Sequence, residues 1–259
     1  MNFDLGLNGQ KVLITGGSKG IGLACAQAFA DAGCDLVLVS RDATALDAAA
    51  DAVRGRAQVT VATHPADLSD AAARAALAAA HPDIDILVNN AGAIPGGKVQ
   101  DLSFERWSEA WALKVMGYIH LTMLYLPRME TRGSGVILNI IGMAGRAPRA
   151  DYVCGATGNA ALIAFTEAVG GRSVDKNVRV LGLNPAATRT ERIKSLARTR
   201  AKARFGNEER WQETLADLPF GRAIEPEECA DLAVFLASDR AAYISGTVVD
   251  LDGGGRNRG

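Results

Sequence analysis

The sequence predicts one α/β domain, a doubly wound parallel sheet with helices on both faces. Short apolar runs alternate with alanine-rich helical stretches along the 259 residues. These runs are apolar throughout, which is typical of strands covered on both sides. Alternating strands and helices favour parallel pairing through right-handed crossovers. No linker, repeat or low-complexity tract interrupts the pattern, so we expect a single domain over residues 1–259.

The expected strands follow one another at intervals that leave room for a helix between most neighbours. The alanine-rich stretches GLACAQAFADAG and DAAARAALAAAH are the clearest helix candidates. The strand candidates are KVLIT (11–15), DLVLVS (35–40), AQVTVA (57–62), DIDILVNN (83–90), GVILNII (135–141), VRVLGLN (178–184) and GTVVDL (246–251).

One insertion, at about 190–218, breaks this rhythm after the sixth strand. It is much longer than an ordinary connection between a strand and a helix. Ligands of open α/β sheets bind beyond the carboxyl ends of the strands. We therefore expect the insertion to form helices over that end of the sheet and to act as a lid.

Composition and charge exclude several classes of function. A net charge of -1 gives no general attraction to nucleic acid or to an anionic membrane. The amino terminus lacks the pattern of a signal peptide, and no apolar run is long enough to span a membrane. Four scattered cysteines without histidines at ligand spacing indicate reduced thiols of a cytoplasmic protein, with no metal site: Cys25, Cys34, Cys154 and Cys229.

A glycine-rich loop, TGGSKGIG (15–22), follows the first strand and opens the first helix. Gly16 can turn tightly, whereas Gly20 and Gly22 let the backbone approach a ligand and the sheet. The amide groups at the start of a helix bind phosphate. The loop therefore predicts a nucleotide site, with Ser18, Lys19 and Ile21 as further contacts.

The end of the second strand indicates which dinucleotide is bound. An acidic side chain there would bind the adenosine ribose and repel a 2′-phosphate. This chain instead has Ser40 and Arg41 at that turn, and Lys19 adds a second cation. These residues favour NADP(H) over NAD(H). The alternative is that both cations are solvated surface charges.

Six ordered motifs together resemble the short-chain dehydrogenase/reductase family along nearly the whole chain. Besides the glycine loop they are ADLSD, NNAG, LNPAATRT, PFGRAIEPEECADLAVFLASD and SGTVVDLDGG. The resemblance implies a Rossmann-type domain, hydride exchange with a small alcohol or carbonyl substrate, and a homodimer or homotetramer. By the same resemblance the cofactor contacts include Asp67, Leu68, Asn90, Ala91, Gly92, Pro185, Thr188 and Thr190.

The residues that carry the family's chemistry are replaced in this chain. Alignment with the family's motifs places Gly142 at its serine, Gly155 at its tyrosine and Asn159 at its lysine. Lys114 stands where the family has an asparagine. Because hydride transfer develops alkoxide charge, a proton donor is required near the substrate oxygen, and neither glycine can supply one.

A relocated set of side chains could perform this chemistry. Tyr152 precedes Gly155 by about one helical turn, so its hydroxyl could reach the vacant space. Lys114 could supply the missing positive charge and lower the pKa of a nearby phenol. Asn159 can hydrogen-bond a ribose hydroxyl. Alternatively, Tyr152 is an ordinary packed residue and Lys114 reaches solvent; Tyr118 is a weaker candidate phenol.

The start of the insertion is strongly basic, with six cations: Arg192, Lys194, Arg198, Arg200, Lys202 and Arg204. They are either a solvated helix surface or a lid that attracts an anionic substrate.

Two alternatives to the oxidoreductase remain open. One is a catalytically silent NADP(H)-binding sensor or partner subunit, and the other is a lysine-based reaction that uses the Lys114 amine as nucleophile or base.

Overall fold

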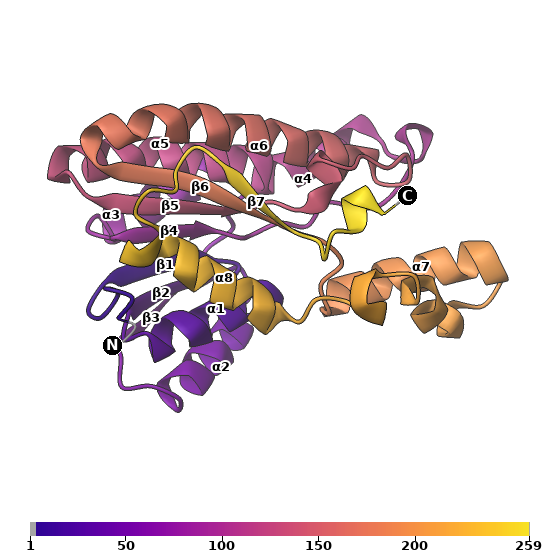
Figure 1. Cartoon of the computed structure of the whole chain (residues 1–259), viewed down its shortest axis with the longest axis horizontal. Coiled ribbons are helices and arrows are strands. Elements are labelled where there is room, and N and C mark those ends of the chain that lie inside the picture. The colour runs from indigo at the N-terminus through magenta and orange to yellow at the C-terminus, as the bar shows by residue number, and fades with distance from the viewer. Residues whose placement is uncertain (1–3, 259) are drawn as a thin grey trace.

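One seven-stranded parallel sheet runs through the molecule in the computed structural model, which describes residues 4–258 (Figure 1). The ends of the predicted domain, residues 1–3 and 259, lie outside the described residues. All neighbouring strands pair in parallel. Their order across the sheet is β3 (Val61–Pro65), β2 (Asp35–Ser40), β1 (Lys11–Thr15), β4 (Ile86–Asn89), β5 (Gly135–Ile140), β6 (Val178–Pro185) and β7 (Val248–Leu251).

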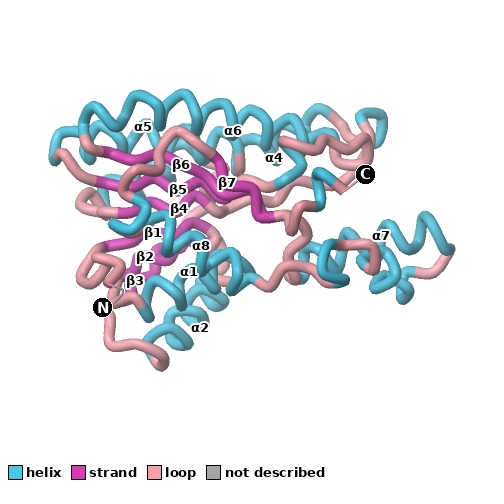
Figure 2. Tube along the Cα trace, in the orientation of Figure 1, coloured by secondary structure: helices cyan, strands magenta, loops and turns pink. Residues whose placement is uncertain are grey.

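Helices cover both faces of this sheet, so the predicted Rossmann-type fold is confirmed (Figures 1 and 2). Each face buries its own apolar cluster. The helices α1 (Gly20–Asp31), α2 (Ala43–Arg54) and α8 (Pro226–Ala237) lie on one side. The opposite side carries α3 (Ala71–Ala80), α4 (Phe104–Leu113), α5 (Val115–Arg132) and α6 (Val153–Ser173).

The third strand begins later than the sequence pattern predicts. The apolar run at 57–62 indicated a strand there, whereas β3 spans Val61–Pro65. Residues before it form turns, in which the Val59 amide donates to the Ala57 carbonyl. The register follows the neighbouring strand, because Leu36 of β2 pairs with Val61. Pairing with β2 thus decided the boundary, and a local run of apolar residues could not reveal it.

The order of the strands reverses between β1 and β4, which places a switch point at the centre of the sheet. In this architecture the connections that follow β1 and β4 diverge to opposite faces and leave a crevice at the carboxyl ends of the strands. The glycine loop follows β1 and the NNAG segment includes the end of β4. Both predicted motifs therefore border the crevice.

The insertion forms a separate lobe that projects from the body of the molecule (Figure 1). Its helix α7 (Glu191–Phe205) packs against the short helix η4 (Glu208–Leu215). Lys194 contributes to this packing, with its ammonium 6.0 Å from the centre of the Trp211 ring. A bridge between Thr188 and Ile224 joins the two ends of the insertion beside the sheet. The predicted helices are present; the role as a lid stays a prediction.

Within residues 4–258 no helix is both long enough and apolar enough to cross a bilayer. The same part of the chain contains no cluster of three metal-ligating side chains. All four cysteines are buried and unbonded to one another. Burial raises the pKa of the Cys229 thiol to about 11, so this thiol is an unreactive core residue.

Candidate functional site

The glycine loop has the geometry of a phosphate cradle. Gly16 and Gly20 adopt φ values of 69° and 57°, a left-handed conformation that favours glycine. A Cβ on Gly22 would lie 2.2 Å from the Gly16 carbonyl oxygen, so only glycine fits there. No side chain caps the start of α1 at Lys19. The first amide groups of α1 are therefore available to an anionic ligand.

A network of hydrogen bonds fastens the end of β4 to this loop. The Asn90 side-chain amide donates to the Thr15 carbonyl at 2.9 Å. The Thr15 hydroxyl accepts from the backbone amides of Asn90 and Ala91, at 2.8 and 3.0 Å. Asn90 and Ala91 thus hold the loop in place, and Gly92 follows beside Lys114. Their contact with the cofactor stays a prediction.

The residues predicted to select the cofactor lie together at the tips of β2 and β3. An Arg41 guanidinium nitrogen lies 3.9 Å from an Asp67 carboxylate oxygen, and both side chains are largely exposed. Hydrogen bonds from Ser69, followed by the charge of Arg41, hold the pKa of Asp67 below its ordinary value. Leu68 is different: its side chain is buried in the core, and its carbonyl accepts a hydrogen bond from Arg74.

The segment after β6 reaches the glycine loop from the other side. Thr190 precedes α7, and its methyl group would lie 3.2 Å from a Cβ on Gly20. Thr188 is buried, and its hydroxyl donates to the Ala186 carbonyl at 3.1 Å. Pro185 ends β6 and is buried. Ser18, Ile21 and Ser40 lie along the same rim and are partly exposed.

Tyr152 occupies the space beside Gly155. A Cβ on Gly155 would lie 2.0 Å from the Tyr152 ring and 2.6 Å from its hydroxyl oxygen. The phenol therefore fills the position from which a side chain at 155 would start. This contact follows from the local structure, because Tyr152 caps α6 with non-helical torsion angles and the ring folds back over the first turn.

The partner of the Tyr152 hydroxyl is Arg192, from the first turn of α7. One guanidinium nitrogen donates to the Tyr152 hydroxyl at 2.8 Å and to the Ile94 carbonyl at 2.7 Å. Burial is the largest effect and raises the pKa of Tyr152 above its ordinary value, while the charge of Arg192 and its hydrogen bond oppose this increase. In the sequence Arg192 is one of six cations of the insertion, and no local pattern separates it from the others.

Lys114 lies on the same side of the crevice, at the junction of α4 and α5. Its ammonium donates to the Ile141 carbonyl at 2.6 Å, and its aliphatic stem lies against Gly92. Burial, with a smaller effect from the charge of Arg192, lowers its pKa to about 7. The cation that contacts Tyr152 is thus Arg192, and Lys114 is an amine that can lose its proton near neutral pH.

Asn159 is buried on α6 and faces Gly142. Its side-chain amide donates to the Gly142 carbonyl at 3.2 Å. Its other polar atom, Oδ1, is buried and has no hydrogen-bond partner. A Cβ on Gly142 would lie 3.1 Å from the Asn159 amide nitrogen. An acceptor left unpaired in this position suits a hydroxyl donor from a bound ligand.

Tyr118 and His120 do not join this group. The Tyr118 side chain is fully buried and its hydroxyl donates to the Ile140 carbonyl at 2.9 Å. His120 accepts a hydrogen bond of 3.0 Å from Arg74. Tyr118, the weaker candidate phenol, therefore lies outside the group around Tyr152.

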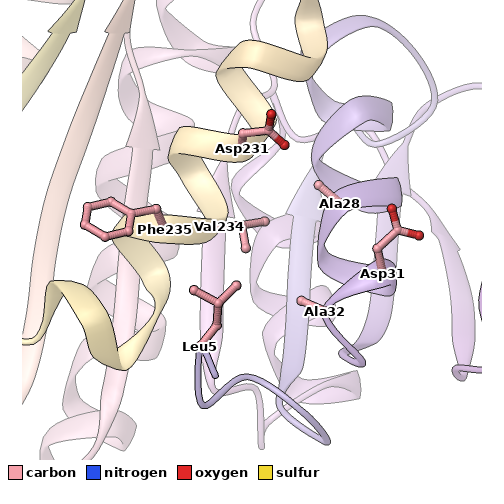
Figure 3. Close-up of a pocket in the computed structure, with 7 residues that line it drawn as sticks. All are labelled: Leu5, Ala28, Asp31, Ala32, Asp231, Val234 and Phe235. Atoms are coloured by element: carbon pink, nitrogen blue, oxygen red, sulfur yellow. The ribbon is translucent and has the colours of Figure 1, made fainter. Parts of the chain in front are cut away.

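A shallow apolar groove between α1 and α8 lies elsewhere on the molecule (Figure 3). Figure 3 shows Leu5, Val234 and Phe235 lining it, with the carboxylates of Asp31 and Asp231 along its sides. Asp31 ends α1, so this part of the groove is near the amino ends of the strands, away from the crevice. The groove therefore belongs to the surface between two helices and not to the site.

A family model described as short chain dehydrogenase matches residues 10–201. The match includes the glycine loop, the NNAG segment and Tyr152. The chain belongs to the short chain dehydrogenase family. This membership agrees with the resemblance inferred from the sequence motifs, and it makes the chain one of a group of oxidoreductases that bind nicotinamide cofactors.

Relatives of this short chain dehydrogenase have diverse activities. The chain is 32% identical to the 2-keto-3-deoxy-L-fuconate dehydrogenase of Xanthomonas campestris pv. campestris over 97% of its length and 81% of the relative. L-Sorbose reductase from Gluconobacter frateurii, solved with NADPH and L-sorbose, is 31% identical with a TM-score of 0.88, covering 97% of this chain and 98% of that one. NAD+-bound xylitol dehydrogenase is 25% identical with a TM-score of 0.88, covering 96% and 99%.

The residues of this short chain dehydrogenase fit a nicotinamide cofactor. The glycine cradle accepts no Cβ at Gly22, the start of α1 is uncapped, and Asn159 Oδ1 is unpaired. These features suit a pyrophosphate at one end and a ribose hydroxyl at the other. The two solved relatives were obtained with NADPH and with NAD+ respectively, so family membership leaves the choice of cofactor open.

Proposed function

We propose that this protein is an NADP(H)-dependent oxidoreductase that exchanges hydride with a small alcohol or carbonyl compound through a relocated active site. The observation that carries the proposal is the position of Tyr152. Its phenol fills the space beside Gly155, where other family members begin their catalytic tyrosine, and the Arg192 guanidinium donates to its hydroxyl at 2.8 Å.

The preference for NADP(H) rests on charge at the tip of β2. Arg41 is exposed there, Lys19 is exposed in the loop, and Ser40 takes the place of an acid. A guanidinium suits a 2′-phosphate in geometry and charge. Asp67 lies 3.9 Å from Arg41 and partly neutralises it. The 2′-phosphate would then compete with the Asp67 carboxylate for Arg41, and the existing ion pair is weak because both side chains are exposed.

The bound cofactor would supply or accept a hydride, and side chains of the protein would donate or accept the proton. In the direction of reduction, Tyr152 donates its phenolic proton to the carbonyl oxygen as hydride adds to the carbon. In oxidation the phenolate removes the hydroxyl proton as hydride leaves. The unpaired Oδ1 of Asn159 would accept a hydrogen bond from a ribose hydroxyl of the cofactor, and Lys114 holds the Ile141 carbonyl next to Gly142.

An anionic substrate is supported by the surroundings of the site. Arg192 is exposed, and no carboxylate in the described chain lies within 4.0 Å of its guanidinium. A relative at 32% identity is named for 2-keto-3-deoxy-L-fuconate, which carries a carboxylate. We therefore place small hydroxy acids and oxo acids among the first compounds to assay.

The test is the substitution Tyr152→Phe. Loss of a general acid–base group lowers turnover by about 100-fold or more. NADPH binding, followed by fluorescence, is expected to stay unchanged because the ring remains in place beside Gly155. Tyr118→Phe is the matched control, since it removes a hydroxyl that only bonds the Ile140 carbonyl. Full activity in Tyr152→Phe would refute the assignment.

A second candidate is a catalytically silent NADP(H)-binding sensor or partner subunit. Gly142 and Gly155 favour it, because neither can offer the hydroxyl that the family uses. This candidate requires NADPH binding without turnover of any carbonyl or alcohol. A lysine-based reaction is a third candidate, favoured by the lowered pKa of Lys114, and trapping of a substrate imine with borohydride would identify it.

A further inference from the structure

We propose that Arg192, on the inserted helix α7, is a positioning residue that holds the Tyr152 hydroxyl and stabilises its phenolate, so that the insertion completes the active site. The inference rests on the proposed function and extends it to a residue outside the family's usual set. It also gives the insertion a defined chemical contribution.

The geometry fixes the guanidinium from two sides. The same Arg192 nitrogen donates to the Tyr152 hydroxyl at 2.8 Å and to the Ile94 carbonyl at 2.7 Å. Ile94 is buried, and so is Cys154 in the cluster against which Tyr152 packs. The phenol and guanidinium therefore meet at the edge of a rigid apolar cluster. Arg192 lies in the first turn of α7, close in the chain to the bridge between Thr188 and Ile224.

The position of the hydroxyl explains why a second group is needed. It lies beside the backbone of Gly155, whereas a tyrosine at 155 would carry its hydroxyl a full side-chain length away. The Tyr152 phenolate would thus form close to helix α6, in partly buried surroundings that disfavour its charge. Arg192 supplies a hydrogen-bonding cation at that oxygen.

The groups around Tyr152 leave Arg192 as the cation that acts on it. From the loop and α4 the neighbours are apolar: Ile94, Leu102, Trp107 and Trp111. From α6, Cys154 has a pKa raised by burial, so it stays neutral. Asp151, next in the chain, is paired with Arg149 at 3.0 Å and lies 3.6 Å from Arg200. Lys114 bonds the Ile141 carbonyl instead.

The expected direction follows from these charges. An opposite charge at hydrogen-bond distance lowers a pKa by about 1 to 3 units. Removing Arg192 therefore raises the pKa of the phenol. Oxidation needs the phenolate, so the acidic limb of its pH–activity profile moves to higher pH. In reduction, which needs the phenol, the alkaline limb moves upward as well.

The experiment compares Arg192→Met with Arg192→Lys and, as a matched control, Lys202→Met. Lys202 is an exposed cation on the same helix, away from Tyr152. The pKa of Tyr152 is measured by ultraviolet absorbance of its phenolate in the protein without substrate. Subtraction of the Tyr152→Phe variant isolates this phenol among four tyrosines. Circular dichroism over the same pH range verifies that each variant stays folded.

We expect Arg192→Met to raise the pKa of Tyr152 and to lower kcat for a neutral carbonyl substrate at least tenfold, with a smaller change in KM. Arg192→Lys should return the pKa of Tyr152 part of the way to its wild-type value. Lys202→Met should change neither this pKa nor kcat. An unaltered phenol pKa in Arg192→Met overturns the inference while leaving the proposed oxidoreductase intact. A raised pKa in a protein without any turnover upholds the contact and refutes the proposed function instead.

Discussion

Lys114 is the residue whose charge depends most directly on the fold. Its amine is enclosed near Ile141, and burial, followed by Arg192, lowers its pKa to about 7 from an ordinary 10.5. Between these two pH values the unfolded chain binds more protons at this position than the native chain. The free energy of unfolding that Lys114 contributes therefore rises as the pH increases from about 7 toward 10.5.

This charge predicts that Lys114→Met stabilises the protein at low pH. Each pKa unit corresponds to about 1.4 kcal/mol, so at pH 6 we expect the variant to gain at least about 1 kcal/mol. The advantage should shrink steadily toward pH 10, where wild-type Lys114 is mostly neutral in the native state. Urea unfolding at several pH values measures the difference. An advantage that does not vary with pH would contradict the lowered pKa.

At this scale the sequence revealed the glycines of the loop after the first strand, whereas the contact between Arg192 and Tyr152 could not be found from it; the roles of these residues stay predictions. The glycines at 16, 20 and 22 are recognisable because their spacing directly follows a strand. The bond between Arg192 and Tyr152 joins residues 40 apart in the chain. It depends on where α7 starts and how Tyr152 caps α6, neither of which leaves a local pattern. The available signal was that Arg192 is the first of the six cations and falls in the first turn of the insertion.

Among the elements, α1 depends on the absence of a side chain at Gly22. Gly22→Ala would place a Cβ 2.2 Å from the Gly16 carbonyl and 2.5 Å from the Asn90 amide nitrogen. The loop must shift, so we expect a loss of about 1–3 kcal/mol in stability and much weaker NADPH binding. Thermal unfolding and a fluorescence titration measure the two effects.

A matched control for that substitution is Gly171→Ala on α6. A Cβ there meets nothing within 4 Å, so the helix should become more stable, by about 0.5–1 kcal/mol. NADPH binding should not change. If Gly22→Ala behaved like Gly171→Ala, the close packing of the loop against Gly16 would be refuted.

The basic residues of helix α7 form ion pairs that the charge pattern of the sequence could not predict. Its basic residues were expected either to be solvated or to attract an anion. In the structure Arg198 lies 3.6 Å from Glu209, and Arg200 lies 3.6 Å from Asp151. These pairs are partly exposed and contribute little stability. The acidic partners are Glu209 of η4 and Asp151, the residue before Tyr152. Tertiary packing brings these partners to the two arginines, and the spacing of the cations in the sequence does not encode that packing.

For the whole molecule, the increase in stability on binding of a dinucleotide is the most direct test of the proposed cofactor site. A ligand that binds only the native state at 100 times its Kd adds about 2.7 kcal/mol of stability. For a protein of this size such a gain raises Tm by about 5–10 °C. We expect NADPH to produce this shift and NADH a much smaller one at equal concentration. The homodimer or homotetramer implied by the resemblance stays a prediction.

The matched variant for this measurement is Arg41→Ser. It should reduce the shift given by NADPH and leave the shift given by NADH nearly unchanged, because only the former carries a 2′-phosphate. Equal shifts with both dinucleotides in the wild type would contradict the preference for NADP(H). The fold and the phosphate cradle do not depend on that preference.

The phenol beside Gly155 also constrains how this site could have arisen. A tyrosine restored at 155 would collide with the ring of Tyr152, whose nearest atom lies 2.0 Å from the added Cβ. Conversely, a chain that carried a side chain at 155 could not have held Tyr152 in its present place. The two positions are therefore coupled: Gly155 cannot take a larger side chain while Tyr152 keeps its place, and a stepwise path to a tyrosine at 155 passes through a protein with a small residue at both positions or a displaced ring.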